Sequence, residues 1–525
     1  MKNFARLAIA SALASSLVVS TNFTAASASD PVDGAGSTWS QIAVDQWRAD
    51  VARQGLVVNY QGVGSTAGRV AYYQAQVDFA VSEIPFQVAQ YDRQGNLLAD
   101  ETQLAASRPY AYLPIVAGGT SFMYNLKANG QRITDLKLSP ATVAKIFTGQ
   151  ITMWNDPLIA ADNPQRVMPA TRIKPVVRSD GSGTTAQFTA FMVSETSSDW
   201  NVLCQRANLG SSCPSTSLYP DFPNSGFAAQ QFSDGVANFV AAQYNDGAIT
   251  YVEYGYAKER GFPVASLKNA SGSYTQPTAV NVSVALQGAR INSDGTQVLS
   301  GVYRNSDARA YPVSSYSYMI VPTTEAAPFT AAKGASLSEY IFYFLCAGQQ
   351  KAEQLGYAPL PRNLVEFGFD AVARIPGAIA APAIDQCSNP TITGGFLVPK
   401  ATTAPTTAPS NGGTSGGTGS GGTGSGGTGG TSSSTTVPGT TTESTIPGAS
   451  GEPGSVDTSG EVTGDASGGG SAIATPGVAM ATSVEIDTEG SGTSPLVYVV
   501  ITFLILAIAF APPLIAGRLR PSVKQ

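Results

Sequence analysis

Apolar residues are distributed unevenly along the chain. Between about residues 30 and 400, short apolar runs alternate with helical patterns and Gly-rich turns, and the runs at 56–60 and 174–177 have the length and composition of strands. Strands that alternate with helices are typical of an α/β fold whose sheet is covered on both faces. About 370 residues are too many for one hydrophobic core, so the pattern predicts two domains.

The N-terminus has a pattern of its own. The uncharged, mostly apolar run 7–19 follows Lys2 and Arg6, and the small residues 26–28 come shortly after it. This order predicts a signal peptide over 1–28, and therefore an exported protein. The alternative is an N-terminal membrane helix, for which the run is short, because a span needs roughly 20 residues.

The C-terminal part differs again. Residues 401–494 are mostly Gly, Ser, Thr and Pro, which predicts a disordered linker rather than a compact third domain. Its r.m.s. reach is about 50–60 Å. Residues 496–515 carry no charge and are long enough for one transmembrane helix. Three basic residues follow, so the positive-inside rule places the tail 516–525 in the cytoplasm and the folded part outside.

Composition narrows the chemistry. The chain has no histidine, the commonest general base and metal ligand, and no clustered metal-ligand motif. We therefore expect no catalytic residue, no metal and no cofactor. The net charge of −6 does not indicate a nucleic-acid partner. In an exported protein the four cysteines are expected to pair, although three connectivities are open and buried free thiols are the alternative. The cysteines are Cys204, Cys213, Cys346 and Cys387.

Four segments rich in glycine and hydroxyl groups are the candidates for a binding site. They are GAGSTW at 34–39, GVGSTAG at 62–68, VDFAVSE at 77–83 and VVRSDGSGTT at 176–185. In three of them a strand ends, a Gly-rich turn follows, and a helix begins with Ser or Thr. Such a helix N-terminus exposes unpaired N–H groups and a partial positive charge, which together suit an oxyanion.

Side chains in these segments extend the predicted anion site. Arg178 supplies a planar set of donors, which Asp180 can hold in place. Alternatively, the hydroxyls are ordinary helix caps and Arg178 forms a surface ion pair. No Walker A pattern is present, which favours a small free anion over a nucleotide. The hydroxyl donors are those of Thr38, Ser65, Ser182 and Thr184.

The order and spacing of these motifs resemble those of the periplasmic phosphate-binding proteins. The similar stretches are GAGSTW, VNYQGVGSTAG, VDFAVSE and VVRSDGSGTT, joined by AKIFTG at 144–149 with Trp154 and by GAITYVEY at 247–254. Together they cover about residues 33–362. The resemblance implies a two-lobed periplasmic-binding-protein fold of type II with a hinge. It also implies capture of inorganic phosphate between the lobes and delivery to an ABC permease.

The resemblance further implies a set of phosphate-binding residues, in which Trp39 acts through its backbone N–H. In that family an Asp stands at the position of Glu83 and accepts the proton that phosphate carries. Sulfate has no such proton and would meet a buried, unpaired charge. Glu is one methylene longer, so we expect the same role with adjusted geometry; the alternative is an exposed acid outside the site. The implied set is Thr38, Trp39, Ser65, Glu83, Arg178, Ser182, Gly183 and Thr184.

The same resemblance implies how the lobes are built. Lobe I would comprise 29–117 and 311–400, and lobe II would comprise 118–310, with crossings near 112–124 and 311–321. The pairs Cys204–Cys213 and Cys346–Cys387 would then each lie within one lobe or just after it. Crossed pairs would join the lobes and hinder the hinge, so the resemblance favours the sequential pairing.

Three other functions compete with phosphate capture. The first is binding of another tetrahedral oxyanion, such as sulfate, arsenate or molybdate. The second is a tethered surface adhesin or sensor, which the linker alone would fit. The third is a phosphatase, which the missing histidines disfavour. In every case the sequence predicts a folded part on the extracytoplasmic face of the cell membrane, anchored by one C-terminal helix.

Overall fold

The computed structural model describes residues 29–88, 90–91, 96–396 and 398. The predicted signal peptide, linker, transmembrane segment and cytoplasmic tail lie outside these residues. Within the described part of the chain, every helix is too short or too polar to span a bilayer.

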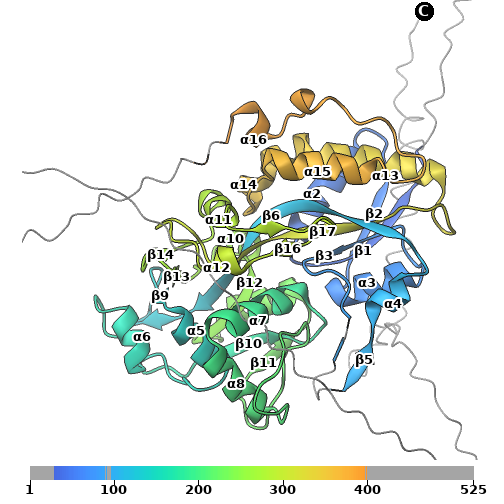
Figure 1. Ribbon diagram of the computed structural model, residues 1–525. Coiled ribbons are helices and arrows are strands. Elements are labelled where there is room, and N and C mark those ends of the chain that lie inside the picture. The colour runs from blue at the N-terminus through green and yellow to red at the C-terminus, as the bar shows by residue number, and fades with distance from the viewer. Residues whose placement is uncertain (1–28, 89, 92–95, 397, 399–525) are drawn as a thin grey trace, which may run out of the picture. The chain divides into compact units, whose positions relative to one another are not determined.

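A mixed sheet of eight strands runs through the described residues (Figure 1), in the order β11-β10-β12-β6-β17-β3-β1-β2. β1 pairs in parallel with β2 and with β3, and β10 pairs in parallel with β11 and with β12, whereas β6 and β17 are antiparallel to their partners. The strands are β1 (Val32–Gly36), β2 (Val58–Gly62), β3 (Phe79–Ser82), β6 (Tyr110–Asn125), β10 (Lys174–Arg178), β11 (Ala228–Gln230), β12 (Ala248–Glu253) and β17 (Ser314–Pro322).

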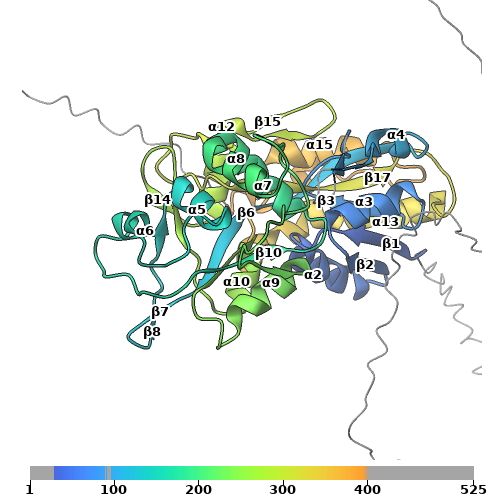
Figure 2. The same cartoon turned by 90° about the horizontal axis from the view of Figure 1, so that it is seen from below.

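Two long central strands join the halves of this sheet. β6 pairs with β17 (Figure 2) over 110–119, and with β12 over 120–125. Both strands are buried along almost their whole length. Neither strand contains a charged residue, as is expected where both faces of a sheet are covered. The register of β17 against β6 shifts between Ser317 and Tyr318, which marks a local irregularity in the strand.

The hydrophobic core is divided in the same way as the sheet. One cluster contains residues between 32 and 117 and between 316 and 387, together with Ala279 and Val282. The others contain residues between Phe122 and Val313. We call these halves lobe I and lobe II. The two-lobed α/β fold is thus the one that the resemblance implies, while the domain boundaries given above stay a prediction.

Helices cover the sheet in both lobes. Those of lobe I are α2 (Gln41–Ala52), α3 (Ser65–Tyr73), α4 (Glu101–Ala105), α13 (Ala331–Leu345), α14 (Ala352–Leu355), α15 (Arg362–Val372) and α16 (Pro390–Thr393). The remainder are α5 (Pro140–Phe147), α6 (Pro157–Asp162), α7 (Gly183–Glu195), α8 (Ser197–Arg206), α9 (Phe232–Ala241), α10 (Tyr254–Glu259), α11 (Ala279–Leu286) and α12 (Ser300–Tyr303). In α2, for example, Ala43, Val44, Trp47 and Val51 form the buried face, at the spacing of an amphipathic helix.

Minor strands complete the fold. They are β4 (Gln90–Tyr91), β5 (Leu97–Ala99), β7 (Lys127–Ala128), β8 (Gln131–Arg132), β9 (Lys137–Leu138), β13 (Ser266–Lys268), β14 (Tyr274–Thr275), β15 (Arg290–Ile291) and β16 (Gln297–Val298). The strand expected at 174–177 is present as β10, and the one expected at 56–60 begins two residues later, as β2. The disulfides Cys204–Cys213 and Cys346–Cys387 have the sequential pairing.

The arrangement of parallel strands places several helix N-termini together. β1 and β2 of lobe I lead into α2 and α3, and β10 and β11 of lobe II lead into α7 and α9. Because the carboxyl ends of parallel neighbours lie at the same edge of a sheet, each lobe presents a pair of helix starts at one edge. The two edges meet, because the N–H of Gly183 at the start of α7 donates to Ser65 Oγ at the start of α3.

Candidate functional site

The turn after β1 is held in place through its carbonyl groups. The carbonyls of residues 37, 38 and 39 accept hydrogen bonds from the hydroxyls of Tyr60, Tyr256 and Tyr357, respectively. Tyr256 belongs to α10 of lobe II, so both lobes fix this turn. The backbone of this turn is also fixed on its donor side, because the N–H of Ser37 donates to the carbonyl of Val81 at 2.8 Å.

Glu83, directly after β3, lies at the centre of a cluster of serine hydroxyls. Its side chain is buried, with 1% of the residue exposed. Oε1 accepts hydrogen bonds from Ser37 and from Ser317, the latter at 2.6 Å, and Oε2 accepts one from Ser65 at 2.7 Å. The interpretation of Glu83 as an exposed acid is therefore wrong. Three hydroxyl donors satisfy the carboxylate without a cation, which keeps its charge local to the site.

Arg178 is the last residue of β10, and its guanidinium is fixed by an acid two residues on. Nε donates to Asp180 Oδ1 at 2.7 Å, and Nη2 donates to Oδ2 of the same carboxylate. The third nitrogen, Nη1, donates to Ser233 Oγ at 3.3 Å. The Arg178 side chain is only 2% exposed, so the alternative of a surface ion pair is wrong.

The backbone of Arg178 is fixed as well. Its N–H donates to the hydroxyl of Tyr251 at 3.2 Å, and that hydroxyl also pairs with Thr185 Oγ1 at 2.8 Å. Burial raises the pKa of Tyr251 to about 12, so the phenol is neutral at physiological pH and keeps its proton for this network. The strand end that carries the guanidinium is thereby joined to helix α7.

The N-terminus of α7 combines a cap, a glycine and an unpaired hydroxyl. Ser182 Oγ accepts the N–H of Thr185 at 3.2 Å, an N-cap interaction. Gly183 N–H donates to Ser65 Oγ at 3.1 Å. Thr184 Oγ1 is buried and has no hydrogen-bond partner among the described residues. A buried hydroxyl without a partner is costly, so this atom marks a position where a ligand would be favourable.

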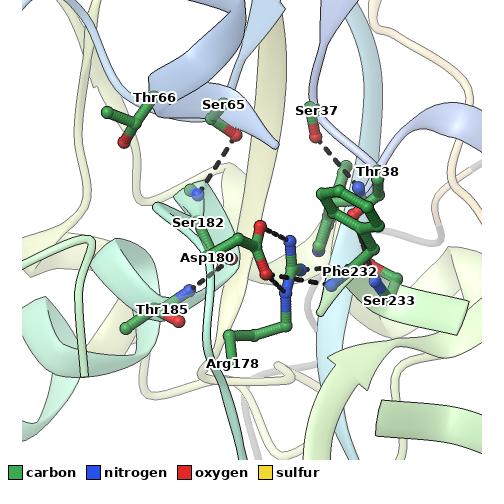
Figure 3. Close-up of polar contacts among 12 residues, drawn as sticks. Ser37, Thr38, Ser65, Thr66, Arg178, Asp180, Ser182, Thr185, Phe232 and Ser233 are labelled. Atoms are coloured by element: carbon green, nitrogen blue, oxygen red, sulfur yellow. Dashed lines mark hydrogen bonds and ion pairs between the residues drawn. The ribbon is translucent and has the colours of Figure 1, made fainter. Parts of the chain in front are cut away.

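Several hydrogen bonds cross from lobe to lobe at this position (Figure 3). Thr38 Oγ1 lies 3.0 Å from Ser233 Oγ, and Ser65 accepts from Gly183 as described. Gln187 Nε2 donates to the carbonyl of Glu83 at 2.7 Å. The lobes are therefore in direct contact around the predicted anion site, as a hinge protein in a closed conformation would be.

The site does not attract an anion through its net charge. The two carboxyl groups of Glu83 and Asp180 outnumber the single guanidinium of Arg178. Any affinity for an oxyanion must come from oriented donors, namely hydroxyls, N–H groups and the N-terminal ends of α2, α3, α7 and α9. Within the described chain there is no cluster of side chains suited to a metal ion.

A cavity of about 650 Å³ adjoins the site. Its lining includes Glu83 and Gln187, the loop 208–220, Tyr303 and Tyr318. The lining contains apolar, amide and hydroxyl side chains and neither Lys nor Arg. Glu83 therefore lies between this cavity and the hydroxyl group of Ser65, and Arg178 does not line the cavity.

The structure brings every residue of the predicted set to the meeting point of the lobes. All are buried, and Asp180 stands behind Arg178. Two of the predicted groups already have partners within their own turns: the N–H of Trp39 donates to Ser37 Oγ at 2.9 Å, and Ser182 caps α7. The set is Thr38, Trp39, Ser65, Glu83, Arg178, Ser182, Gly183 and Thr184.

Sequence reasoning did not select four residues that the structure adds. Ser37 stands beside Thr38 in the first motif, so its position in that motif is a signal that could have found it. Gln187 lies in α7, two residues after the fourth motif, and this proximity is a similar signal. Ser233 and Ser317 lie in segments without a Gly-rich turn. Their contacts depend on tertiary packing, and the sequence pattern around them gives no signal of it.

Comparison with known proteins identifies the family of this chain. A family model described as a PBP superfamily domain matches residues 21–347. This chain belongs to the PBP superfamily. Its relatives in the superfamily include the phosphate-binding protein PstS of Xylella fastidiosa strain 9a5c, 30% identical over 337 residues, which cover 64% of this chain and 83% of the relative. PstS of Haemophilus influenzae is 28% identical over 336 residues, which cover 64% of this chain and 90% of the relative.

A solved structure is similar in fold to this PBP-superfamily chain. It is the crystal structure of the ancestral soluble variant of the human phosphate-binding protein, with a TM-score of 0.50 and 18% identity. The similarity covers 67% of this chain and all of the other. The motif resemblance to periplasmic phosphate-binding proteins is confirmed by these relatives.

Proposed function

We propose that this protein captures free inorganic phosphate between its lobes and delivers it to an ABC permease. The relatives named phosphate-binding protein PstS support this assignment, since they match most of their own length to this chain. The geometry supports it independently, because oriented N–H and hydroxyl donors from both lobes surround one buried guanidinium. This donor-rich environment suits an oxyanion better than a neutral ligand.

The observation that carries the proposal is the unpaired hydroxyl of Thr184. This atom is buried at the start of α7, six residues after Arg178, and has no partner among the described residues. A bound oxyanion would give it an acceptor and at the same time face the partial positive charge of the helix N-terminus.

The other contacts follow from the same position. Phosphate would accept hydrogen bonds from hydroxyls, from backbone N–H groups and from Arg178. Ser65 donates to Glu83 and the N–H of Trp39 donates to Ser37. Both groups would share these hydrogen bonds with the ligand. The proposed set is Thr38, Trp39, Ser65, Arg178, Ser182, Gly183 and Thr184, with Glu83 as the acceptor.

Glu83 is the proposed discriminator between anions. Its carboxylate accepts the proton of a protonated phosphate oxygen, whereas sulfate at neutral pH presents only acceptors to it. Two buried acceptors facing each other without a proton are strongly unfavourable. Arsenate carries a comparable proton, so Glu83 distinguishes sulfate from phosphate but does not distinguish arsenate from phosphate.

The placement in the cell rests on the sequence. We propose that the signal peptide 1–28 directs export and that 496–515 anchors the chain in the membrane, with 516–525 in the cytoplasm. Residues 401–494 would act as a tether with a reach of about 50–60 Å. A tether of that length lets the folded part meet a permease in the same membrane.

Calorimetric titration of the full chain in detergent tests the function. The protein is first unfolded and refolded with its disulfides intact, to remove any bound anion, and is then titrated with phosphate and with sulfate at pH 7. Tight binding of one phosphate per chain with no sulfate heat is expected. Absence of phosphate binding, or equal binding of sulfate, would overturn the named ligand.

A further inference from the structure

Ser233, at the start of helix α9, lies where the two lobes and the buried arginine meet. Its side chain is fully buried, with no exposed area. Ser233 Oγ is the acceptor for Arg178 Nη1 at 3.3 Å, because a guanidinium can only donate. The same oxygen lies 3.0 Å from Thr38 Oγ1 in lobe I, and the N–H of Ser233 donates to Thr38 Oγ1 at 3.2 Å. One residue thus contacts both the guanidinium and the opposite lobe (Figure 3).

The preceding backbone is arranged to hold Ser233 there. Phe232 has φ of +60°, an unfavourable conformation for a residue with a bulky side chain. Its N–H donates to Asp180 Oδ1 at 2.9 Å, the oxygen that also accepts from Arg178 Nε. A carboxylate that binds both the arginine and the start of α9 fixes the distance between them. The strained turn therefore places Ser233 beside the guanidinium.

A count of protons shows what the pair of hydroxyls can still do. Thr38 and Ser233 have two hydroxyl protons, and one of them lies between the two oxygens. If Ser233 donates to Thr38, the proton of Thr38 is left over; if Thr38 donates, the proton of Ser233 is left over. The described residues supply no acceptor for that second proton at either oxygen. In both orientations, one proton remains for an anion bound between the lobes.

We propose that Ser233 is a positioning residue of the phosphate site and that it holds the lobes closed over the ligand. This inference rests on the function proposed above. Ser233 orients Thr38 and Arg178, which would each contact phosphate, and its bonds with Thr38 form only when the lobes meet. Its contribution should therefore appear in the rate at which phosphate leaves, because dissociation requires opening, and hardly at all in the rate at which it enters.

The test uses radiolabelled phosphate and the full chain in detergent, with rapid mixing for association and a chase of unlabelled phosphate for dissociation. Ser233→Ala is expected to raise the dissociation rate about tenfold, the size of effect of losing one hydrogen bond to a charged group. The association rate should change less than about twofold. The matched control is Ser338→Ala, since Ser338 is a buried serine of α13 whose hydrogen bonds stay within lobe I.

A double-mutant cycle with Thr38→Val tests the cross-lobe contact itself. If the two hydroxyls act as a unit, adding Ser233→Ala to Thr38→Val changes the dissociation rate little, whereas independent residues give additive effects. Additive effects, or a dissociation rate in Ser233→Ala equal to that of Ser338→Ala, would overturn the role of Ser233 while leaving phosphate binding established. Failure of the unmodified chain to bind phosphate would overturn both proposals.

Discussion

Ser317 donates a hydrogen bond of 2.6 Å to Glu83 Oε1 and so joins a strand shared by the two halves of the sheet to the acid of the site. The register of β17 against β6 shifts directly after Ser317, a place where a strand bends and redirects its side chains. Glu83 is consequently held from three separate segments, by Ser37, Ser65 and Ser317. A longer acid than the family's Asp is kept in one orientation by this arrangement.

Replacing Glu83 by Gln tests its role in anion selection. The amide retains the size of the side chain but removes the charge and one acceptor, and it adds a donor facing the ligand. Phosphate affinity should fall about 10- to 100-fold, because a hydrogen bond to a charged group is lost. The affinity for sulfate should rise relative to that for phosphate, since the carboxylate that repels sulfate is removed. Titration calorimetry with both anions measures the two effects.

Glu83→Asp serves as the control for that change. It keeps the charge and the acceptors while shortening the side chain to the length found in the family. We expect it to retain the preference for phosphate over sulfate, whatever its effect on affinity. An unchanged preference in Glu83→Gln would show that selection lies elsewhere in the site.

Gly183 is predicted to be irreplaceable for ligand binding. A Cβ at this position would lie 2.0 Å from Glu83 Oε2 and 2.7 Å from Ser65 Oγ, far inside van der Waals contact. Gly183→Ala should therefore hold the lobes apart and weaken phosphate binding about 100-fold, an effect of about 3 kcal/mol. The melting temperature without phosphate should change by only a few degrees, because each lobe keeps its own core.

Gly235→Ala is the matched control for Gly183→Ala. Gly235 lies within α9, and the nearest atom to an added Cβ is 3.5 Å away, an ordinary contact distance. Alanine also favours a helix interior by about 1 kcal/mol over glycine. Phosphate affinity should be unaffected and stability should rise slightly. Equal affinity in the Gly183 and Gly235 variants would contradict the tight fit between the lobes.

Arg178→Lys should reduce phosphate affinity although it conserves the charge. The guanidinium binds Asp180 through two nitrogens and Ser233 through the third, a geometry that a single ammonium cannot reproduce. We expect a loss of about 100-fold in affinity, measured by calorimetry. The control is Arg309→Lys, because Arg309 pairs with Asp307 through two nitrogens at the same sequence separation outside the site. That variant should bind phosphate normally.

The parts of the site that sequence could predict are those built by local chain geometry. A strand, a Gly-rich turn and a hydroxyl residue at a helix start are contiguous, so Ser65 and the segment around Arg178 were identifiable from their neighbours. The pairing of Arg178 with Asp180 spans two residues and is local in the same way. The two-lobed fold followed from the motif order, which the family comparison confirms.

The rest required tertiary contacts that no local pattern encodes. Ser317 and Glu83 are 234 residues apart, and Thr38 and Ser233 are 195 apart. Ser182 forms the ordinary helix cap that its position favours, and its role as a ligand residue stays a prediction. A hydroxyl at a helix start can cap or bind a ligand, and only its hydrogen-bond partners in the fold distinguish the two uses.

Stability should depend on pH through Glu253. This residue is fully buried, and burial raises its pKa well above the ordinary value, although Oε2 accepts the N–H of Gly255. A raised carboxyl pKa in the folded state gives stability that is present below the unfolded pKa and is lost as pH rises through the folded pKa. Glu253→Gln removes this dependence. The free energy of unfolding of the variant should equal that of the original chain near pH 4 and exceed it by about 1 kcal/mol at pH 8.

Denaturant unfolding at a series of pH values measures this difference. Glu366→Gln is the control, because Glu366 is an exposed acid of α15 that pairs with Arg362 at the surface. Removing that pair should change stability by less than about 1 kcal/mol at any pH. A constant difference between Glu253→Gln and the original chain across the series would show that Glu253 does not titrate in this range.

The two disulfides should contribute unequally to stability and not at all to ligand affinity. Cys346 and Cys387 are separated by 41 residues, whereas Cys204 and Cys213 are separated by nine. In the chain-entropy model, the larger loop restricts the unfolded state more. The expected contribution to the free energy of unfolding is about 4 kcal/mol for Cys346–Cys387 and about 2.5 kcal/mol for Cys204–Cys213. Double Ala variants of each pair, unfolded in denaturant at the same pH, measure these losses.

Phosphate affinity measured in the same two variants shows whether a disulfide only stabilises the fold or also affects closure of the lobes. Each disulfide joins segments of a single lobe, so neither restrains the movement of one lobe against the other. Affinity should therefore match that of the original chain as long as the variants remain folded at the temperature of the titration. A weakened affinity in a variant that is still fully folded would mean that the disulfide helps to set the position of a ligand-binding segment. The pair Cys204–Cys213 is the more informative of the two, because Cys213 lies in the loop that lines the cavity beside Glu83.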